Sequence, residues 1–212
     1  LFRITPHPFA ILRSSAAFLG RRLNRSRRRP QALIVRGAIV TGFLCCATGS
    51  VGWMISSWGE TYPAGWVVDL MFLVFFVSQR GSYSDASRTV RAQSKNGLVA
   101  GRKALAGYHK GRIDALDDYV IDRSLTEHLA AEMGRWLIGP MFWYLVGGLS
   151  VLLVYATIVA AVDALATDDK SRAGFGWTAS RLEFMGGWLP GRIAGVFLVL
   201  ASLLAPTARP IR

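Results

Sequence analysis

Long apolar segments separated by polar stretches dominate this chain. Four such segments occupy residues 31–57, 65–79, 136–166 and 188–206. A helix needs about 20 apolar residues to cross a hydrocarbon layer of ~30 Å, so the first and last segments qualify by length. The segment 65–79 is shorter and contains Asp69. The pattern predicts an all-α, polytopic membrane protein with about four transmembrane or re-entrant helices.

The segment 136–166 allows two interpretations. It is long for one crossing and short for two, and Gly139-Pro140 and Gly147-Gly148 interrupt it. One long tilted helix would place the C-terminus in the cytoplasm. Two half-length helices would form a re-entrant hairpin around the glycine pair, which requires protein or water to cover the irregular backbone.

The polar stretches divide the chain into four regions. Residues 1–30 are a basic N-terminal segment, in which residues 8–23 are predicted to form an amphipathic helix on the membrane surface. Residues 31–79 hold the first two membrane segments. Residues 80–135 are a polar loop, predicted to be cytoplasmic with amphipathic helices near 84–107 and 114–133. Residues 136–212 form the C-terminal membrane region.

Positive charge is concentrated at the start of the chain. The net charge is +12, and no acidic residue precedes Glu60. Nucleic-acid binding is one interpretation of such a basic stretch. Because it leads directly into an apolar segment, we favour anchoring by the positive-inside rule, with a cytoplasmic N-terminus in a bacterial inner membrane, a lipid bilayer as partner and no nucleic acid. The arginines expected at the membrane surface are Arg21, Arg22, Arg25, Arg27, Arg28 and Arg29.

Common soluble-enzyme signatures are absent: the sequence has no phosphate loop, HExxH, CxxC or GxSxG. Asp114, Asp118 and Asp122 would share one face of a helix, with Asp117 beside them. Such carboxylates could hold Mg²⁺ together with a substrate phosphate. A solvated helix face is the simpler interpretation, and these residues alone favour it.

Several short motifs occur in an order that resembles one protein family. They are His7-Pro8, RRLNR at 21–25, Gly111-Arg112, Leu116-Asp117 with Arg123 and Glu127, Pro140-Met141-Phe142-Trp143, FGW at 175–177, Arg181-Leu182-Glu183, and Trp188-Leu189-Pro190-Gly191-Arg192. Together they resemble the adenosylcobinamide-phosphate synthases of cobalamin biosynthesis, the CobD/CbiB family.

The resemblance implies an ATP- and Mg²⁺-dependent ligase that joins aminopropanol, or its phosphate, to a propionate of adenosylcobyric acid. Such amide formation needs metal-held phosphates and polar groups around an activated carboxylate. If the chain is such an enzyme, it binds a corrinoid, and the catalytic candidates are Asp114, Asp117, Glu127, Arg181, Glu183 and Arg192. These residues would then have to face one cytoplasmic cavity.

The departures from the family pattern fall mainly on polar positions. Arg135-Trp136 stands where the family has Asp-Gly, Ala130-Ala131-Glu132 where it has Ala-Glu-Asn, and Phe184 and Gly187 where it has Asp and Asn. Arginine in place of a carboxylate reverses the charge and would repel a metal ion. The sequence therefore favours a non-catalytic relative without a firm cofactor, acting as a structural or accessory subunit beside other membrane proteins.

Overall fold

The computed structural model describes residues 8–23, 30–62, 64–77, 91, 118–165 and 173–204. The described residues are helical, with turns between them and no strand, as the apolar pattern predicted. The helices are α1 (Pro8–Leu23), α2 (Pro30–Glu60), α3 (Gly65–Phe76), α5 (Asp118–Met133), α6 (Gly139–Leu165) and α7 (Ala173–Leu204), with a π-helical turn η1 (Gly134–Ile138) before α6.

Within the part of the chain that the structure describes, three helical stretches are long and apolar enough to cross a membrane: Gln31–Gly59, Thr126–Leu165 and Gly174–Ala201. The second predicted segment, 65–79, is shorter than expected, because α3 has 12 residues and ends at Phe76. At 1.5 Å per residue it rises about 18 Å, which is less than a full crossing. The predicted loop helix near 114–133 is α5, whereas the one near 84–107 lies outside the described residues except for residue 91.

The chain forms two compact units. Unit 1 comprises Leu1–Val77 and Gly139–Pro190, and unit 2 comprises Ser78–Ile138 and Gly191–Arg212. Unit 1 therefore contains α1, α2, α3, α6 and the first part of α7, up to Pro190. Unit 2 contains α5, η1 and the rest of α7.

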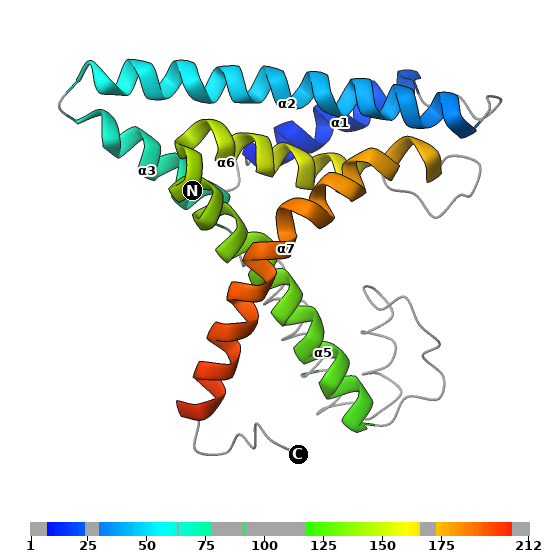
Figure 1. Cartoon of the computed structure of the whole chain (residues 1–212), viewed down its shortest axis with the longest axis vertical. Coiled ribbons are helices and arrows are strands. Elements are labelled where there is room, and N and C mark those ends of the chain that lie inside the picture. Colours follow the sequence, from blue (N-terminus) through cyan, green and yellow to red (C-terminus); the bar gives the residue numbers. More distant parts are fainter. Residues whose placement is uncertain are drawn as a thin grey trace. The chain divides into compact units, whose positions relative to one another are not determined.

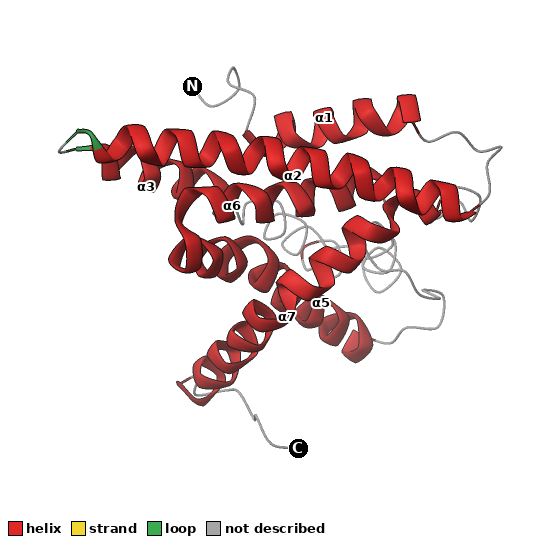
Figure 2. Ribbon diagram, turned by 45° about the horizontal axis from the view of Figure 1, so that its top comes forward, coloured by secondary structure: helices red, strands yellow, loops and turns green. Residues whose placement is uncertain are grey.

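In unit 1, the second half of α6 runs along α2 (Figures 1 and 2). One core cluster joins four helices through Ala16, Leu33, Val40, Leu44, Ala161, Leu165, Phe175 and Ala179. A second cluster, centred on Phe76, Leu149 and Leu152, packs α3 against α6. Because Ala16 and Gly20 of α1 are buried, with Gly20 directed at Leu165, α1 packs against protein as well as presenting a basic surface.

Small residues bring the backbones of unit 1 close together. A Cβ at Gly37 of α2 would overlap the Phe175 carbonyl of α7, and one at Gly52 would lie 2.7 Å from the Ser150 Cα of α6. Glycine at such crossings is typical of helices that associate in lipid, where close van der Waals packing replaces the hydrophobic effect. These glycines set how near α2 lies to its neighbours.

The glycine pair inside α6 breaks the helix, as one of the two sequence interpretations proposed. Gly147 has φ −150° and ψ 25°, and Gly148 has φ 64° and ψ −157°. The Gly148 values lie in a region that residues with a Cβ rarely adopt. The chain changes direction sharply there (Figure 1), so residues 139–165 are not one straight helix.

In unit 2, η1 and the C-terminal part of α7 approach through small residues. A Cβ at Gly134 would lie 3.5 Å from the Ala194 Cβ and 3.6 Å from the Gly191 Cα, which is ordinary contact. The π-helical turn has a local cause. Pro140 has no N–H to donate to the carbonyl four residues earlier, and π-helical turns accommodate such an interruption.

Candidate functional site

The six catalytic candidates lie in different parts of the chain. Asp114 and Asp117 are outside the described residues. Glu127 and Arg192 belong to unit 2, and Arg181 and Glu183 belong to unit 1. A common cavity for all six therefore stays a prediction.

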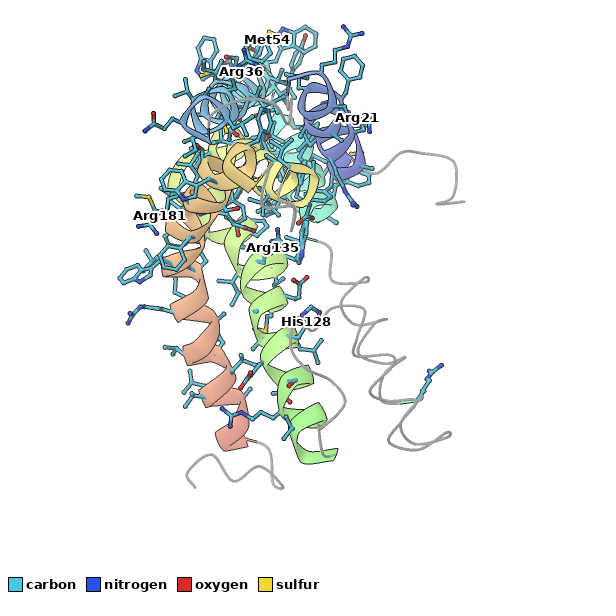
Figure 3. All side chains as sticks on the ribbon, turned by 90° about the vertical axis from the view of Figure 1, so that its right-hand side faces the viewer. Arg21, Arg36, Met54, His128, Arg135 and Arg181 are labelled. Atoms are coloured by element: carbon cyan, nitrogen blue, oxygen red, sulfur yellow. The ribbon has the colours of Figure 1, made fainter. Side chains whose placement is uncertain are left out.

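Within unit 1, Arg181 and Glu183 do not share a helix face. They are two positions apart on α7, and residues at that spacing point in different directions. Arg181 is exposed on the outer side of the helix (Figure 3), with its guanidinium carbon 5.8 Å from the centre of the Phe184 ring. Phe184 stands where the family has a carboxylate. Arg181 therefore contacts an aromatic ring at the position where family members offer a carboxylate for an ion pair.

Within unit 2, Glu127 pairs with a neighbour on α5. The Arg123 Nε lies 2.8 Å from Glu127 Oε1, in an i, i+4 arrangement, with the two side chains 67% and 65% exposed. Such exposed pairs contribute little to stability. Asp118 and Asp122 both belong to α5, four residues apart, while Asp114 lies outside the described residues.

The substituted position Arg135-Trp136 lies in the π-helical turn η1. The guanidinium carbon of Arg135 is 5.4 Å from the centre of the Trp136 ring. A cation over an aromatic face is attracted by the ring's electron density. The described part of unit 2 thus presents a stacked cation where the family has a carboxylate. Across the described residues, no three or more His, Cys, Asp or Glu side chains are grouped to hold a metal ion.

Of the six arginines predicted at the membrane surface, two lie among the described residues. Arg21 and Arg22 are exposed in the last turn of α1, with the Arg22 guanidinium carbon 4.8 Å from the centre of the Phe18 ring. Figure 3 shows Arg21 directed outward from the helix. Arg25, Arg27, Arg28 and Arg29 lie outside the described residues.

The aromatic and proline motifs make the contacts that hold unit 1 together. The Trp143 Nε1–H donates a 3.0 Å hydrogen bond to the Gly186 carbonyl, joining α6 to α7. The Trp143 ring lies 6.5 Å from the Tyr155 ring, and a Cβ at Gly139 would overlap the Tyr155 hydroxyl. Pro140 and Pro190 are buried.

Pro190 explains why the Gly186 carbonyl is available. In an α-helix this carbonyl would accept the N–H four residues later, but that residue is Pro190, which has none. The Trp143 indole supplies the missing donor. Two motifs that lie far apart in the sequence, Pro-x-Phe-Trp and Trp-x-Pro-x-Arg, therefore form one structural junction of Trp143, Gly186 and Pro190. The sequence contained both motifs but no sign that they meet.

Comparison with known proteins agrees with this motif set. The family model described as CobD/Cbib protein matches residues 2–211. A cobalamin biosynthesis protein CobD from Brucella suis biovar 1 (strain 1330) is 26% identical over 205 residues, covering 96% of this chain and 63% of the relative. The CobD of Halalkalibacterium halodurans is 24% identical over 197 residues, covering 92% and 60%.

The chain thus spans a little under two thirds of the length of these curated relatives. No solved structure matches it. Since the family model covers almost every residue and the retained motifs form the junction between α6 and α7, the chain belongs to the CobD/CbiB family.

Proposed function

We propose that this CobD/CbiB-family chain is a non-catalytic member, which serves as a structural or accessory subunit of a bacterial inner-membrane assembly. The observation that carries the proposal is that retained family residues make contacts between helices. Trp143, Pro190 and Phe175 are family motif residues, and all three make or enable contacts between helices.

Two of the polar candidates that the structure describes, Glu127 and Arg181, have ordinary surroundings. Glu127 is exposed and paired with Arg123 on its own helix, and Arg181 is exposed over Phe184. Arg135 introduces a positive charge where the family has an aspartate. A fold maintained without selection for metal-assisted amide formation would keep its packing residues and lose polar ones, as at Arg135, Phe184 and Gly187.

An accessory role requires surfaces for a partner, and unit 1 has them. Exposed tryptophans and phenylalanines include Phe43, Trp53 and Trp58 on α2, Trp66 on α3, and Trp177, Phe184 and Trp188 on α7. Exposed aromatic side chains on apolar helices are common both at the lipid interface and at the hot spots of protein interfaces. Other membrane subunits are therefore the proposed partners, and isolation in mild detergent followed by mass spectrometry would identify them.

Complementation of a corrinoid auxotroph that lacks the synthase tests the main proposal. We expect no growth when this chain is expressed, although immunoblotting detects it in the membrane fraction. The gene of a curated CobD relative is the positive control. Growth supported by this chain alone would refute the non-catalytic role.

The second candidate is an active adenosylcobinamide-phosphate synthase, favoured by the retained Arg181, Glu183 and Arg192. It predicts ATP- and Mg²⁺-dependent amide formation between adenosylcobyric acid and aminopropanol or its phosphate. Purified protein would show this product by mass spectrometry, and Glu183→Gln would remove it. Lack of product in a preparation that is folded, as judged by its thermal unfolding transition, would exclude this candidate.

A further inference from the structure

In unit 1, the hairpin formed by α2 and α3 (Figure 1) carries an apolar groove. Its volume is about 550 Å³, within the range of about 300–1,000 Å³ that is usual for small-ligand sites. The side chains that line it come from the last turns of α2, from the turn and from the start of α3: Met54, Ile55, Trp58, Tyr62, Ala64 and Val68. None of them carries a charge, so a ligand held here must be apolar where it contacts them.

Contacts within the hairpin hold the two walls of the groove together. A Cβ at Gly65 would overlap the Gly59 carbonyl, so α2 and α3 meet there at backbone distance. The turn is closed by its own hydrogen bonds, from the Tyr62 N–H to the Gly59 carbonyl at 3.1 Å and from the Gly65 N–H to the Tyr62 carbonyl at 3.0 Å. The Ser56 hydroxyl of α2 also donates to Asp69 Oδ2 of α3, at 3.3 Å. The walls are therefore joined by contacts that need no ligand.

The groove lies at the end of a helix that is long enough to span a membrane. The apolar stretch Gln31–Gly59 has 29 residues and rises about 43 Å, which exceeds a hydrocarbon layer of ~30 Å. Its last turn therefore reaches the depth of the lipid headgroups when α2 crosses a bilayer. Trp58, Tyr62 and Trp66 are exposed around this end, and such residues favour the boundary between headgroups and hydrocarbon. The groove thus opens where acyl chains meet their headgroups.

The chemistry of the groove fits a lipid at both of its ends. An apolar groove that stayed empty beside hydrocarbon would forfeit dispersion contacts along its walls, and an acyl chain restores them. At the rim, the Trp58 and Tyr62 rings meet edge to face with their centres 6.4 Å apart. Neither the Trp58 indole N–H nor the Tyr62 hydroxyl donates a hydrogen bond to another of the described residues. The ester and phosphate oxygens of a phospholipid are acceptors at this depth, and tryptophan and tyrosine are suited to such a boundary because one end is apolar and the other polar.

We propose that this groove binds one acyl chain of a membrane phospholipid, and that the Trp58 indole and the Tyr62 hydroxyl donate hydrogen bonds to its ester or phosphate oxygens. The site is separate from the catalytic candidates, and it does not depend on whether the chain makes an amide. It also leaves the other exposed aromatic side chains of unit 1 available to a protein partner.

The test uses the full chain, both in lipid nanodiscs and in the membranes of cells that express it. A fraction of the phospholipid carries a diazirine on one acyl chain, and mass spectrometry locates the lipid-labelled peptides after illumination. Lipids in passing contact label every lipid-facing stretch, so the exposed residues Val35, Ile39 and Phe43 of α2 serve as the reference. We expect residues 54–68 to be labelled several-fold more than this reference. The chain extracted in mild detergent should also retain about one phospholipid in native mass spectrometry.

Val68→Trp fills the groove, so it should reduce the labelling of residues 54–68 to the reference level and release the retained lipid. Val67→Trp is the matched control, because Val67 is the preceding residue of α3, is similarly exposed and does not line the groove. It should keep both the labelling and the lipid.

A second pair of variants carries the test if Val68→Trp has no thermal unfolding transition and so fails to fold. Trp58→Ala removes one wall of the groove and a donor at its rim, and it should weaken lipid retention several-fold. Trp66→Ala removes an exposed tryptophan of α3 that does not line the groove, and it should retain the lipid.

The proposal is overturned if the labelling of residues 54–68 does not exceed the reference, if folded Val68→Trp keeps the lipid, or if Trp58→Ala and Trp66→Ala lose it equally. Labelling that occurs in nanodiscs but not in cell membranes would mean that another protein covers the groove, and this result would overturn the proposal as well.

Discussion

At the scale of single residues, the junction of Trp143, Gly186 and Pro190 shows how a missing donor shapes a fold. Pro190 removes the N–H that would occupy the Gly186 carbonyl, and the Trp143 indole replaces it at 3.0 Å. A buried carbonyl left without any donor would cost about 1–3 kcal/mol. The tryptophan is therefore needed because the proline is present.

This coupling predicts a specific double-mutant result. Trp143→Phe keeps an aromatic ring but loses the N–H, and we expect it to destabilise the chain by about 1–2 kcal/mol, or roughly 2–8 °C in the unfolding midpoint. In a Pro190→Ala background, the alanine N–H can bond to the Gly186 carbonyl, so the same substitution should cost less. Thermal unfolding of the four proteins measures the coupling energy.

Trp53→Phe serves as the control, because Trp53 is 69% exposed on α2. It should change the midpoint little in either background. If Trp143→Phe costs the same with and without Pro190, the proline and the indole act independently and the junction as described is wrong.

At the scale of elements, α2 is a helix whose neighbours are held close by glycine. Gly37 faces the Phe175 backbone and Gly52 faces the Ser150 backbone, whereas Gly42 on the same helix has no packing neighbour within 4 Å of the position that a Cβ would take. The apolar run predicted that α2 would be a long helix. It did not show which of the glycines lie at crossings, because a glycine in contact and a glycine facing lipid look alike in sequence.

The two kinds of glycine should respond to alanine with opposite signs. Alanine favours a helix over glycine by about 1 kcal/mol, so Gly42→Ala should be neutral or stabilising. Gly37→Ala would place a methyl group on the Phe175 carbonyl, so α7 must move away from α2 and the chain should lose about 1–3 kcal/mol. Unfolding midpoints in a single detergent distinguish these outcomes. Equal effects at the two positions would mean that α2 and α7 do not meet at Gly37.

At the scale of the whole molecule, the distribution of charge predicts an orientation that stays a prediction. The basic N-terminal segment precedes the first long apolar helix, Gln31–Gly59, and no acidic residue occurs before Glu60. Basic residues are retained on the cytoplasmic side during insertion. Among the described residues, three apolar stretches are long enough to cross the membrane, and the orientation of the first is expected to constrain the others.

Reporter fusions test the orientation. A fluorescent protein fused to the N-terminus should be bright, and alkaline phosphatase fused there should be inactive, because both report a cytoplasmic location. Replacing Arg25, Arg27, Arg28 and Arg29 by serine should reduce this bias, whereas replacing the exposed Arg13 alone should not. An N-terminus that stays cytoplasmic after the four substitutions would show that these arginines do not orient the chain.

For much of the candidate site, the sequence predicted which residues matter but not which of them meet. The motif Pro-x-Phe-Trp was visible, but the partner of the Trp143 indole lies 43 positions away on another helix. Glu127 could have been paired with Arg123 from its i, i+4 spacing, since helical neighbours follow from sequence alone. Asp114 and Asp117 lie outside the described residues, and their role as catalytic candidates stays a prediction.

The amino-acid sequence by itself determined the helical class, the long apolar stretches and the family, and it left a break at Gly147-Gly148 as one of two alternatives. These follow from composition, periodicity and local backbone preference, which act over a few residues. Only the tertiary structure decided that α1 is part of the core, that Trp143 completes the bonding left open by Pro190, and that Asp69 meets Ser56 across a turn. Those contacts join residues distant in the chain, and they exist only because packing brings particular helix faces together.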